Sequence, residues 1–294
     1  MNPATGAVPS GLPPDGRSAP YDAFYTARAR TDLVTRLYAA AMGENYPSEV
    51  AAFSSCDWPL LGLMTARLRL RPGQMLVDAG CGTGGIGLWL ARALSLRLAG
   101  FDLSPVAVVQ AAARRSHFGL PAARTAFRVA ELENTGLPDA AADGIVCVDA
   151  FGHATDRIAA LRELGRLLAP GGRLLLTRAL RSGAMPSWRE QAQAAGLVVE
   201  DVDERPAEPA MWQRLYRLWI AHAAELHREL GQAQARHMLE EAQRVLPMLP
   251  DRRAVLLTLR RPGASPKAPE TVDTMAQPGS RLGREPMPSK RRPQ

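Results

Sequence analysis

The sequence predicts an α/β fold built on a mostly parallel sheet, and two observations support this fold class. Short runs of strand type alternate with helical patterns from residue 75 onward, and this repeated order is typical of a parallel sheet covered on both faces. The 294 residues are 46% hydrophobic and 22% charged, so the chain can bury a core and does not have the composition of a disordered protein.

Five strands are expected first along the chain, and each is a short, mostly aliphatic run. They span residues 75–80, 96–102, 126–131, 144–150 and 172–177. Helices are expected between them near residues 84–95, 105–118 and 155–169. The last of these helices has an apolar face at helical spacing, formed by Ile158, Leu161, Gly165 and Leu168.

The pattern changes after the fifth strand. The elements expected there are a helix over residues 187–195, a strand over 197–202, a helical insertion over 203–250 and a last strand over 253–259. Residues 21–72 form another helical segment, ahead of the first strand. Neither helical segment is needed to complete the sheet, so we expect the two to form a helical cap beside a sheet domain over residues 73–261.

Both ends of the chain are expected to be disordered. Residues 1–20 and the basic tail 262–294 are rich in Pro, Gly and Ser, and few large apolar side chains there could offset the entropy lost on ordering. The first segment lacks the apolar core of a secretion signal. No run approaches the roughly 18 apolar residues of a membrane-spanning helix, so we expect a cytoplasmic protein with no membrane partner.

Charge and cysteine content argue against a nucleic-acid partner, a disulfide framework and a zinc site. The net charge is +7, but much of the excess lies in the tail, so the folded part gives little support for a nucleic-acid partner. Cys56, Cys81 and Cys147 are an odd number at wide spacings, which fits neither a disulfide framework nor a zinc site. We predict a small-molecule substrate, and a homodimer is compatible with the sequence.

A glycine-rich loop joins the first strand to the first helix, with the sequence Asp78-Ala79-Gly80-Cys81-Gly82-Thr83-Gly84. Glycines at alternate positions allow a sharp turn and a close approach by a ligand. Together with Gly85 the loop also fits the G-x-G-x-x-G pattern of dinucleotide-binding folds, and Asp102 follows about 20 residues later, where such folds keep a ribose-binding carboxylate. Spacing alone leaves both ligand classes open.

The charge of Asp78 favours a cationic ligand. This residue lies two positions before the first glycine, so its carboxylate is expected near the loop. At about 4 Å it would repel a pyrophosphate by about 1–4 kcal/mol, depending on screening, whereas an ammonium or sulfonium group would be attracted. We therefore expect a cationic cofactor that carries a ribose.

These residues resemble the D/E-x-G-x-G-x-G motif of the class I S-adenosylmethionine-dependent methyltransferases, and the resemblance covers about residues 75–259. It implies a seven-stranded, mostly parallel Rossmann-like sheet with an antiparallel last strand. It also implies S-adenosyl-L-methionine as cofactor and S-adenosyl-L-homocysteine as product. The residues that the resemblance assigns to the cofactor are Asp78, Gly80, Gly82, Gly84, Asp102, Leu103, Glu131, Leu132 and Asp149.

The resemblance also gives roles to some of these residues. Asp102 would accept both ribose hydroxyls, Glu131 would accept from the adenine amino group, and Leu132 would cover the ring. The family more often has Asp at the position of Glu131. Asp149 would position the methionine end of the cofactor, the loop itself or the substrate, and these alternatives stay open.

His153 is the candidate general base. It follows the fourth predicted strand, and the resemblance places its loop next to the transferable methyl group. An imidazole titrates near neutrality, as a base should, and a base would matter if the acceptor is a hydroxyl. The alternative is a histidine that only hydrogen-bonds its loop or the next helix start.

Aromatic side chains are concentrated in the two predicted cap segments. In the insertion they share one helix face with aliphatic residues, at Trp212, Leu215, Tyr216, Trp219 and Ala223. This face is either ordinary packing or the apolar lid of a substrate pocket, with His222 and His227 near its rim. The residues predicted to line the pocket are Tyr25, Phe151, Trp212, Tyr216 and Trp219.

The predicted function is methylation of an oxygen or carbon atom on an apolar small molecule, in bacterial natural-product tailoring. Two alternatives stay open: a cyclase of the same fold that uses S-adenosylmethionine structurally, and a non-catalytic binding module. The loop at residues 149–152 lacks the D/N-P-P-Y/F motif of amino-methylating DNA enzymes. An Asp-Asp-Asn cluster like that of magnesium-dependent catechol enzymes is not found, so we predict no metal.

Overall fold

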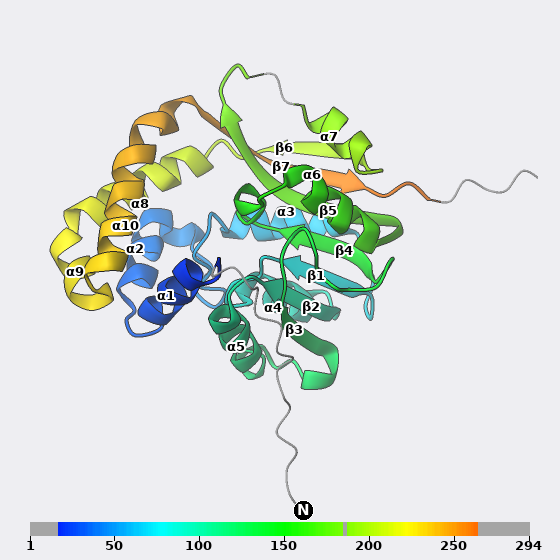
Figure 1. Ribbon diagram of the computed structural model, residues 1–294, viewed down its shortest axis with the longest axis horizontal. Helices are drawn as coiled ribbons and strands as arrows, with labels where there is room; N and C mark the ends of the chain where they lie inside the picture. The colour runs from blue at the N-terminus through cyan, green and yellow to red at the C-terminus, as the bar shows by residue number, and fades with distance from the viewer. Residues whose placement is uncertain (1–16, 185–186, 264–294) are drawn as a thin grey trace, which may run out of the picture. The chain divides into compact units, whose positions relative to one another are not determined.

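The computed structural model describes residues 17–184 and 187–263, which contain a seven-stranded sheet (Figure 1). The strands are β1 (Met75–Ala79), β2 (Arg97–Asp102), β3 (Thr125–Val129), β4 (Ala142–Cys147), β5 (Leu168–Arg181), β6 (Val198–Glu204) and β7 (Arg252–Arg260). Their order is β3-β2-β1-β4-β5-β7-β6. β7 pairs antiparallel with both β5 and β6, and the other four pairs are parallel, so the predicted fold class is confirmed.

Helices cover both faces of the sheet, as parallel strands joined by crossovers require. On one face lie α3 (Trp58–Leu68) and α4 (Gly85–Ala93), and on the other lie α6 (Arg157–Leu167) and α7 (Trp188–Ala194). Helix α5 (Pro105–Ala113) packs beside β2 and β3. In β1, Val77 and Ala79 belong to the core under α6, whereas Leu76 belongs to the core under α3 and α4. This alternation follows from the two-residue period of a strand.

Capping residues fix where the site-bearing helices begin. The Asp156 side chain accepts from the amides of Ile158 and Ala159 at 2.9 and 3.0 Å, at the start of α6. Ser104 caps α5 through the amide of Ala107 at 3.2 Å. Each cap satisfies amides that the first helical turn leaves unpaired.

The strand β5 is longer than the six residues expected from its sequence. It runs over Leu168–Arg181 because it pairs with β7 from Arg173 opposite Arg260 to Arg181 opposite Arg252. This pairing joins segments far apart in the chain, so the local pattern does not reveal it.

The two predicted cap segments pack against each other (Figure 1). The cap helices are α1 (Ala19–Arg28), α2 (Leu33–Met42), α8 (Glu208–Ala221), α9 (Ala223–Leu230) and α10 (Gln232–Val245). They share a core separate from those of the sheet, which includes Leu37, Tyr38, Leu215, Tyr216 and Trp219. Within the described residues, no helix combines the length and apolar character needed to span a membrane.

Two arginines, one half-buried and one buried, tie the insertion to the rest of the fold. Arg252 on β7 pairs with Glu208 on α8 at 2.6 Å. Arg205, just before α8, donates to the hydroxyl and the carbonyl of Ser55 at 2.9 and 2.5 Å. These contacts fix the entry to the insertion against both β7 and the N-terminal segment.

The N-terminal boundary differs from the prediction, since α1 begins at Ala19 rather than near residue 21. Nearly all of the two end segments that the sequence predicts to be disordered lies outside the described residues.

Helix α4 packs so closely on β1 that Gly87 leaves no room for a side chain. A Cβ there would lie 2.6 Å from Asp78 Oδ2 and 2.9 Å from Asp78 Cβ. We expect Gly87→Ala to lower the free energy of unfolding by about 1–3 kcal/mol, as overpacking does, measured by urea denaturation. The matched control is Gly62→Ala on the exposed face of α3, where nothing lies within 4 Å. It is expected to raise stability by up to about 1 kcal/mol, and equal stability of both variants would contradict the close packing.

Candidate active site

A cavity of about 980 Å³ lies where the carboxyl ends of the parallel strands meet the cap, the edge where α/β sheets bind ligands. On the sheet side it is lined by residues that the sequence predicts to bind the cofactor: Gly80, Gly82, Asp102, Leu103, Glu131, Leu132 and Asp149. On the cap side it is lined by Tyr25, Trp212, Tyr216 and Trp219 of the predicted pocket. Both halves of the predicted site therefore face one space.

The glycine loop uses most of its own amides. The amides of Gly80 and Cys81 both donate to the carbonyl of Phe101 at 2.9 Å, and the amide of Gly84 donates to the carbonyl of Cys81 at 2.8 Å. A fourth amide, that of Gly82, donates to a side chain described below. A pyrophosphate is usually held by free backbone amides of such a loop, so this loop is poorly suited to a phosphate ligand.

Asp102 is the side chain that holds the loop. Its Oδ2 accepts from the amide of Gly82 at 2.8 Å and its Oδ1 accepts from the amide of Ser104 at 2.9 Å. The residue is 8% exposed, and burial raises its pKa. Each carboxylate oxygen can accept more than one hydrogen bond, so Asp102 can still accept two hydroxyl donors from the cavity. This geometry fits a ribose.

Helix α1 covers this part of the loop. A Cβ on Gly82, whose φ is +51°, would lie 2.8 Å from the hydroxyl of Tyr25. Asp22, one turn earlier on α1, accepts from the hydroxyl of Ser104. The N-terminal cap thus forms one wall of the sheet-side half of the cavity.

The position of Asp78 corrects the electrostatic argument drawn from the sequence. Its carboxylate does not line the cavity but lies beneath α4, where Oδ2 accepts from the amide of Gly87 at 2.9 Å. The residue is 2% exposed, and burial raises its pKa to about 7. Asp78 therefore holds the start of α4, and a full negative charge facing the ligand is not supported.

Gly84 is the other predicted cofactor residue outside the cavity lining. It is the N-cap of α4, with φ +76°, and a Cβ there would lie 2.9 Å from Cβ of Ala111 on α5. The lack of a side chain at Gly84 allows the start of α4 to pack closely against α5.

Glu131 and Leu132 line the cavity after β3. The carboxylate of Glu131 pairs with Arg17, and Arg17 also donates to the hydroxyl of Thr155 at 3.0 Å. A ligand amino group would therefore share Glu131 with this arginine. The predicted adenine contact stays a prediction.

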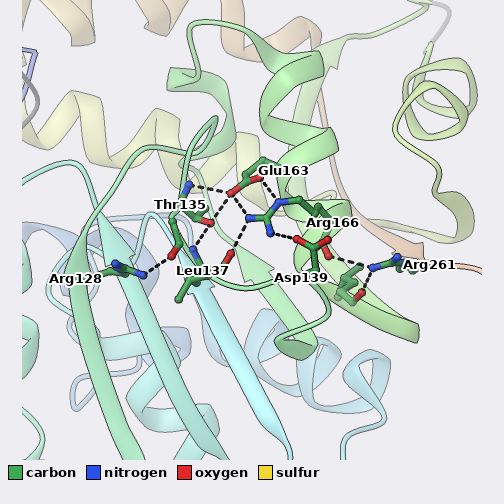
Figure 2. Close-up of polar contacts among 9 residues, drawn as sticks. Arg128, Thr135, Leu137, Asp139, Glu163, Arg166 and Arg261 are labelled. Atoms are coloured by element: carbon green, nitrogen blue, oxygen red, sulfur yellow. Dashed lines mark hydrogen bonds and ion pairs between the residues drawn. The ribbon is translucent and has the colours of Figure 1, made fainter. Parts of the chain in front are cut away.

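A polar network holds residues 135–139, which follow Glu131 and Leu132 in the chain (Figure 2). Glu163 on α6 accepts from the amide and the hydroxyl of Thr135 at 3.0 and 2.5 Å. Arg166, one turn later, pairs with Glu163 at 2.7 Å and donates to the carbonyl of Leu137 at 2.8 Å. Hydrogen bonds from Arg166 lower the pKa of Glu163 to about 2, so the carboxylate is charged and the segment is held in place.

Asp149 connects three parts of the fold beside the cavity. Its Oδ2 accepts from the amide of Ser55 at 2.6 Å, and its Oδ1 accepts from the hydroxyl of Thr177 on β5 at 3.0 Å. Its φ is +54°, an uncommon conformation outside glycine that often marks a functional position. The carboxylate is engaged by the protein itself, which favours a role in holding the loop.

His153 lies at the edge of the cavity in a short 3-10 turn, residues Phe151–His153. Its ring is exposed and stands edge-on to Tyr21, with 6.0 Å between ring centroids. No hydrogen bond joins either ring nitrogen to another described residue, so the imidazole is accessible from the cavity. Its role as a base stays a prediction.

Phe151 corrects the predicted substrate pocket. It is 2% exposed and lies in the core under α6 rather than in the cavity, because the 3-10 turn directs its ring toward the sheet. His222 and His227, expected near the rim, do not line the cavity, whereas His237 on α10 does.

Arg28, Arg205, Glu208, Glu241 and Arg252 also line the cavity and were missed. Helical spacing could have revealed Arg28, since it shares a face of α1 with Phe24 and Tyr25.

Among the residues that the structure describes, no group of three or more His, Cys, Asp or Glu could hold a metal ion. The lack of a metal stays a prediction.

Residues 77–176 match the protein family described as Methyltransferase domain. The matched segment contains the glycine loop, Asp102, Glu131 and Asp149.

Named relatives match parts of this chain. Phosphoethanolamine N-methyltransferase 1 of Arabidopsis thaliana is 33% identical over 46% of this chain and 28% of its own length. The 27-O-demethylrifamycin SV methyltransferase of Amycolatopsis mediterranei is 30% identical over 53% of this chain and 55% of its own length. An O-methyltransferase of Pyrenophora dematioidea is 28% identical over 58% of this chain and 67% of its own length. The match thus spans from 28% to 67% of these relatives.

Solved structures share the fold. The 4+2 cyclase SpnF aligns with a TM-score of 0.67 and 24% identity, over 86% of this chain and 99% of its own. A methyltransferase from Geobacter sulfurreducens, solved with S-adenosyl-L-homocysteine, aligns with a TM-score of 0.53 and 20% identity, over 76% of this chain and 97% of its own. At these identities the likeness concerns the fold.

The raised pKa of Asp78 predicts a pH-dependent stability. The folded protein keeps this proton up to about pH 7, whereas the unfolded chain releases it near its usual value of 3.8. The folded state therefore binds more protons between these values, and its stability falls as the pH rises through that window. Asp78→Asn keeps an acceptor for the amide of Gly87 and cannot ionise. We expect the stability of this variant relative to wild type to rise by up to about 4 kcal/mol from pH 4 to pH 7.5, measured by urea denaturation. A difference that stays level over this range would contradict the buried carboxyl.

Proposed function

We propose that this chain, which belongs to the class I S-adenosylmethionine-dependent methyltransferases, methylates an oxygen or carbon atom of an apolar small molecule. The observation that carries the proposal is the single cavity with the glycine loop and carboxylates on one side and aromatic cap residues on the other. S-adenosylmethionine, the cofactor of this domain, supplies a methyl group already activated on a sulfonium.

The residues proposed to hold the cofactor follow from their place in the cavity. Asp102 is assigned to the ribose hydroxyls, because its oxygens keep acceptor capacity beyond the amides of Gly82 and Ser104. Glu131 and Leu132 are assigned to the adenine. Asp149 is assigned to the loop beside the methionine end, where its contacts with Ser55 and Thr177 keep that wall rigid.

The cap is proposed to align the acceptor and exclude water. Alignment of two reactants can contribute about 7–11 kcal/mol to lowering a barrier. Tyr25, Trp212, Tyr216 and Trp219 provide large, rigid contact surfaces for an apolar molecule. His153, exposed at the cavity edge, is proposed to take the proton of an acceptor hydroxyl.

Natural-product tailoring in bacteria is the proposed setting. It is supported by the 27-O-demethylrifamycin SV methyltransferase of Amycolatopsis mediterranei and by the methyltransferase GfsG of Streptomyces halstedii, which is 28% identical over 47% of this chain. The arginine-rich composition is typical of GC-rich bacterial genomes.

A cyclase is the second candidate, because the chain aligns over 99% of the 4+2 cyclase SpnF. The aromatic cap could equally hold a folded polyene, with S-adenosylmethionine bound and unreacted. Methyl transfer from labelled S-adenosylmethionine into a product separates the two, since a cyclase leaves the label in the cofactor.

The ribose assignment predicts that Asp102→Asn weakens binding of S-adenosylhomocysteine. Loss of charge-assisted hydrogen bonds to the ribose should raise the Kd about tenfold to a hundredfold, measured by calorimetry. The matched control is Asp143→Asn, which also accepts a backbone amide, that of Met75 at 2.8 Å, but lies at the opposite end of the sheet. An unchanged Kd in Asp102→Asn would remove the assignment.

The base assignment predicts that His153→Gln lowers kcat for a hydroxyl acceptor by about 10²–10⁴, with the Kd for S-adenosylhomocysteine unchanged. Turnover would be measured as labelled methyl transfer into a panel of hydroxylated polyketides. The control is His237→Gln, a second exposed histidine at the same cavity, which should keep wild-type turnover. If only the control variant loses activity, His153 is not the base, and if wild type transfers no label the methylation proposal fails.

A further inference from the structure

Arg28 is a buried cation in the cap half of the cavity. It lies at the end of α1, is 5% exposed and lines the cavity. On α1 it follows Tyr25 by about one turn, and the hydroxyl of Tyr25 lies against the glycine loop. Arg28 thus lies one helical turn beyond the residue that contacts the glycine loop, and it lines the same cavity.

The guanidinium of Arg28 is held by aromatic rings rather than by an anion. Its central carbon lies 3.5 Å from the ring centroid of Phe24 and 4.6 Å from that of Phe53. Its Nε and Nη1 atoms are buried and have no hydrogen-bond partner. Within residues 17–184 and 187–263 it forms no ion pair with a carboxylate. Two donors therefore remain open beside the cavity.

Two other arginines of the cavity have polar partners, and three more, Arg157, Arg178 and Arg244, are exposed or half-buried. Arg252 pairs with Glu208 at 2.6 Å, and Arg205 donates to the carbonyl and hydroxyl of Ser55. An isolated buried charge costs several kcal/mol unless it is compensated. Burial accordingly lowers the pKa of Arg28 to about 10, which leaves the group charged at neutral pH. A site that keeps such a charge unpaired is suited to an anionic ligand.

Neighbouring titratable groups limit the charge of that ligand. The hydroxyl of Tyr38 is a hydrogen-bond partner of the Arg28 side chain, but burial raises the pKa of Tyr38, so this hydroxyl stays neutral and is no counter-ion. Glu241 on α10 also faces the cavity and accepts from the hydroxyl of Tyr216 at 2.8 Å. Glu241 interacts electrostatically with Arg28, so the second negative charge of a dianion bound at Arg28 would be repelled by this carboxylate. The charge pattern therefore fits a single negative charge.

We propose that Arg28 binds a carboxylate of the acceptor, so that the substrate class is an apolar, aromatic or conjugated monocarboxylate. The rings of Phe24, Phe53 and Tyr38 provide the apolar surroundings for its body. That the bound carboxylate belongs to the methyl acceptor rests on the proposed function. The anion site itself does not depend on methyl transfer.

The test uses three ligands that share one ring system: 2-naphthoate, its methyl ester and 2-naphthyl phosphate. Each is titrated by calorimetry into full-length protein already saturated with S-adenosylhomocysteine. For wild type we expect 2-naphthoate to bind about tenfold to a hundredfold tighter than the ester, and tighter than the phosphate. Saturation by S-adenosylhomocysteine is measured first, so failure of the cofactor site is seen separately.

Two variants of position 28 assign the preference to this side chain. Arg28→Met and Arg28→Gln should lose the preference for 2-naphthoate and bind the ester as wild type does, within about threefold. The matched control is Arg244→Met, which removes an exposed arginine of the same cavity and should keep the preference.

The melting temperature of Arg28→Met distinguishes a binding role of Arg28 from a purely structural one. If Arg28 only stabilised the fold, its replacement would lower the melting temperature. Because an unpaired buried cation destabilises the fold, Arg28→Met should melt at or above the wild-type temperature. The proposal is overturned if wild type does not bind 2-naphthoate at about 1 mM or does not prefer it over the ester. It is also overturned if 2-naphthyl phosphate binds tighter, if both position-28 variants keep the preference, or if Arg28→Met melts lower. Lack of methyl transfer together with the expected preference would leave the anion site and remove only the proposed function.

Discussion

The site depends on one carboxylate that joins two loops. Asp102, at the end of β2, accepts the amide of Gly82 from the first loop and the amide of Ser104 from its own. The carbonyl of Phe101 takes two further amides of the first loop. Because these amides are satisfied within the protein, the loop offers few donors to a phosphate and leaves acceptor oxygens for hydroxyl groups. The backbone hydrogen bonding of the loop therefore disfavours a dinucleotide, whereas the sequence argument relied on repulsion by Asp78.

The cap and the sheet differ in the kinds of side chains that form their cores. The sheet cores are mostly aliphatic, and the strands bring backbone groups to the cavity edge. The cap core is formed jointly by the N-terminal segment and by the insertion between β6 and β7, and the charged groups at its base are paired or hydrogen-bonded at Glu208, Arg252 and Arg205. Arg28 is the contrasting case, since aromatic rings surround it without an anion. A buried charge without a partner of opposite charge is expected at positions where function competes with stability.

The sequence was sufficient for the sheet and insufficient for several side-chain directions. Aliphatic runs predicted the strands because a buried parallel strand needs them on both faces, but the full extent of β5 depends on pairing with the distant β7. Asp78 faces α4 because its neighbours Val77 and Ala79 face the other layer, and the motif alone does not say which face lines the ligand. Phe151 was placed in the pocket by proximity in sequence, but a 3-10 turn directs it into the core. Arg28 was missed because a lone arginine on a helix is usually solvated.

The cap has its own core, distinct from the two that stabilise the sheet, and this separation bears on how such proteins diversify. Substitutions at distant, independent positions have nearly additive effects on stability. A lineage can therefore exchange residues on α8 and α10, which do not contact the glycine loop in the way that α1 does, and so admit new molecules while that loop remains intact. Proteins descended from one ancestor would then share the same cofactor chemistry and differ in the substrates that they accept.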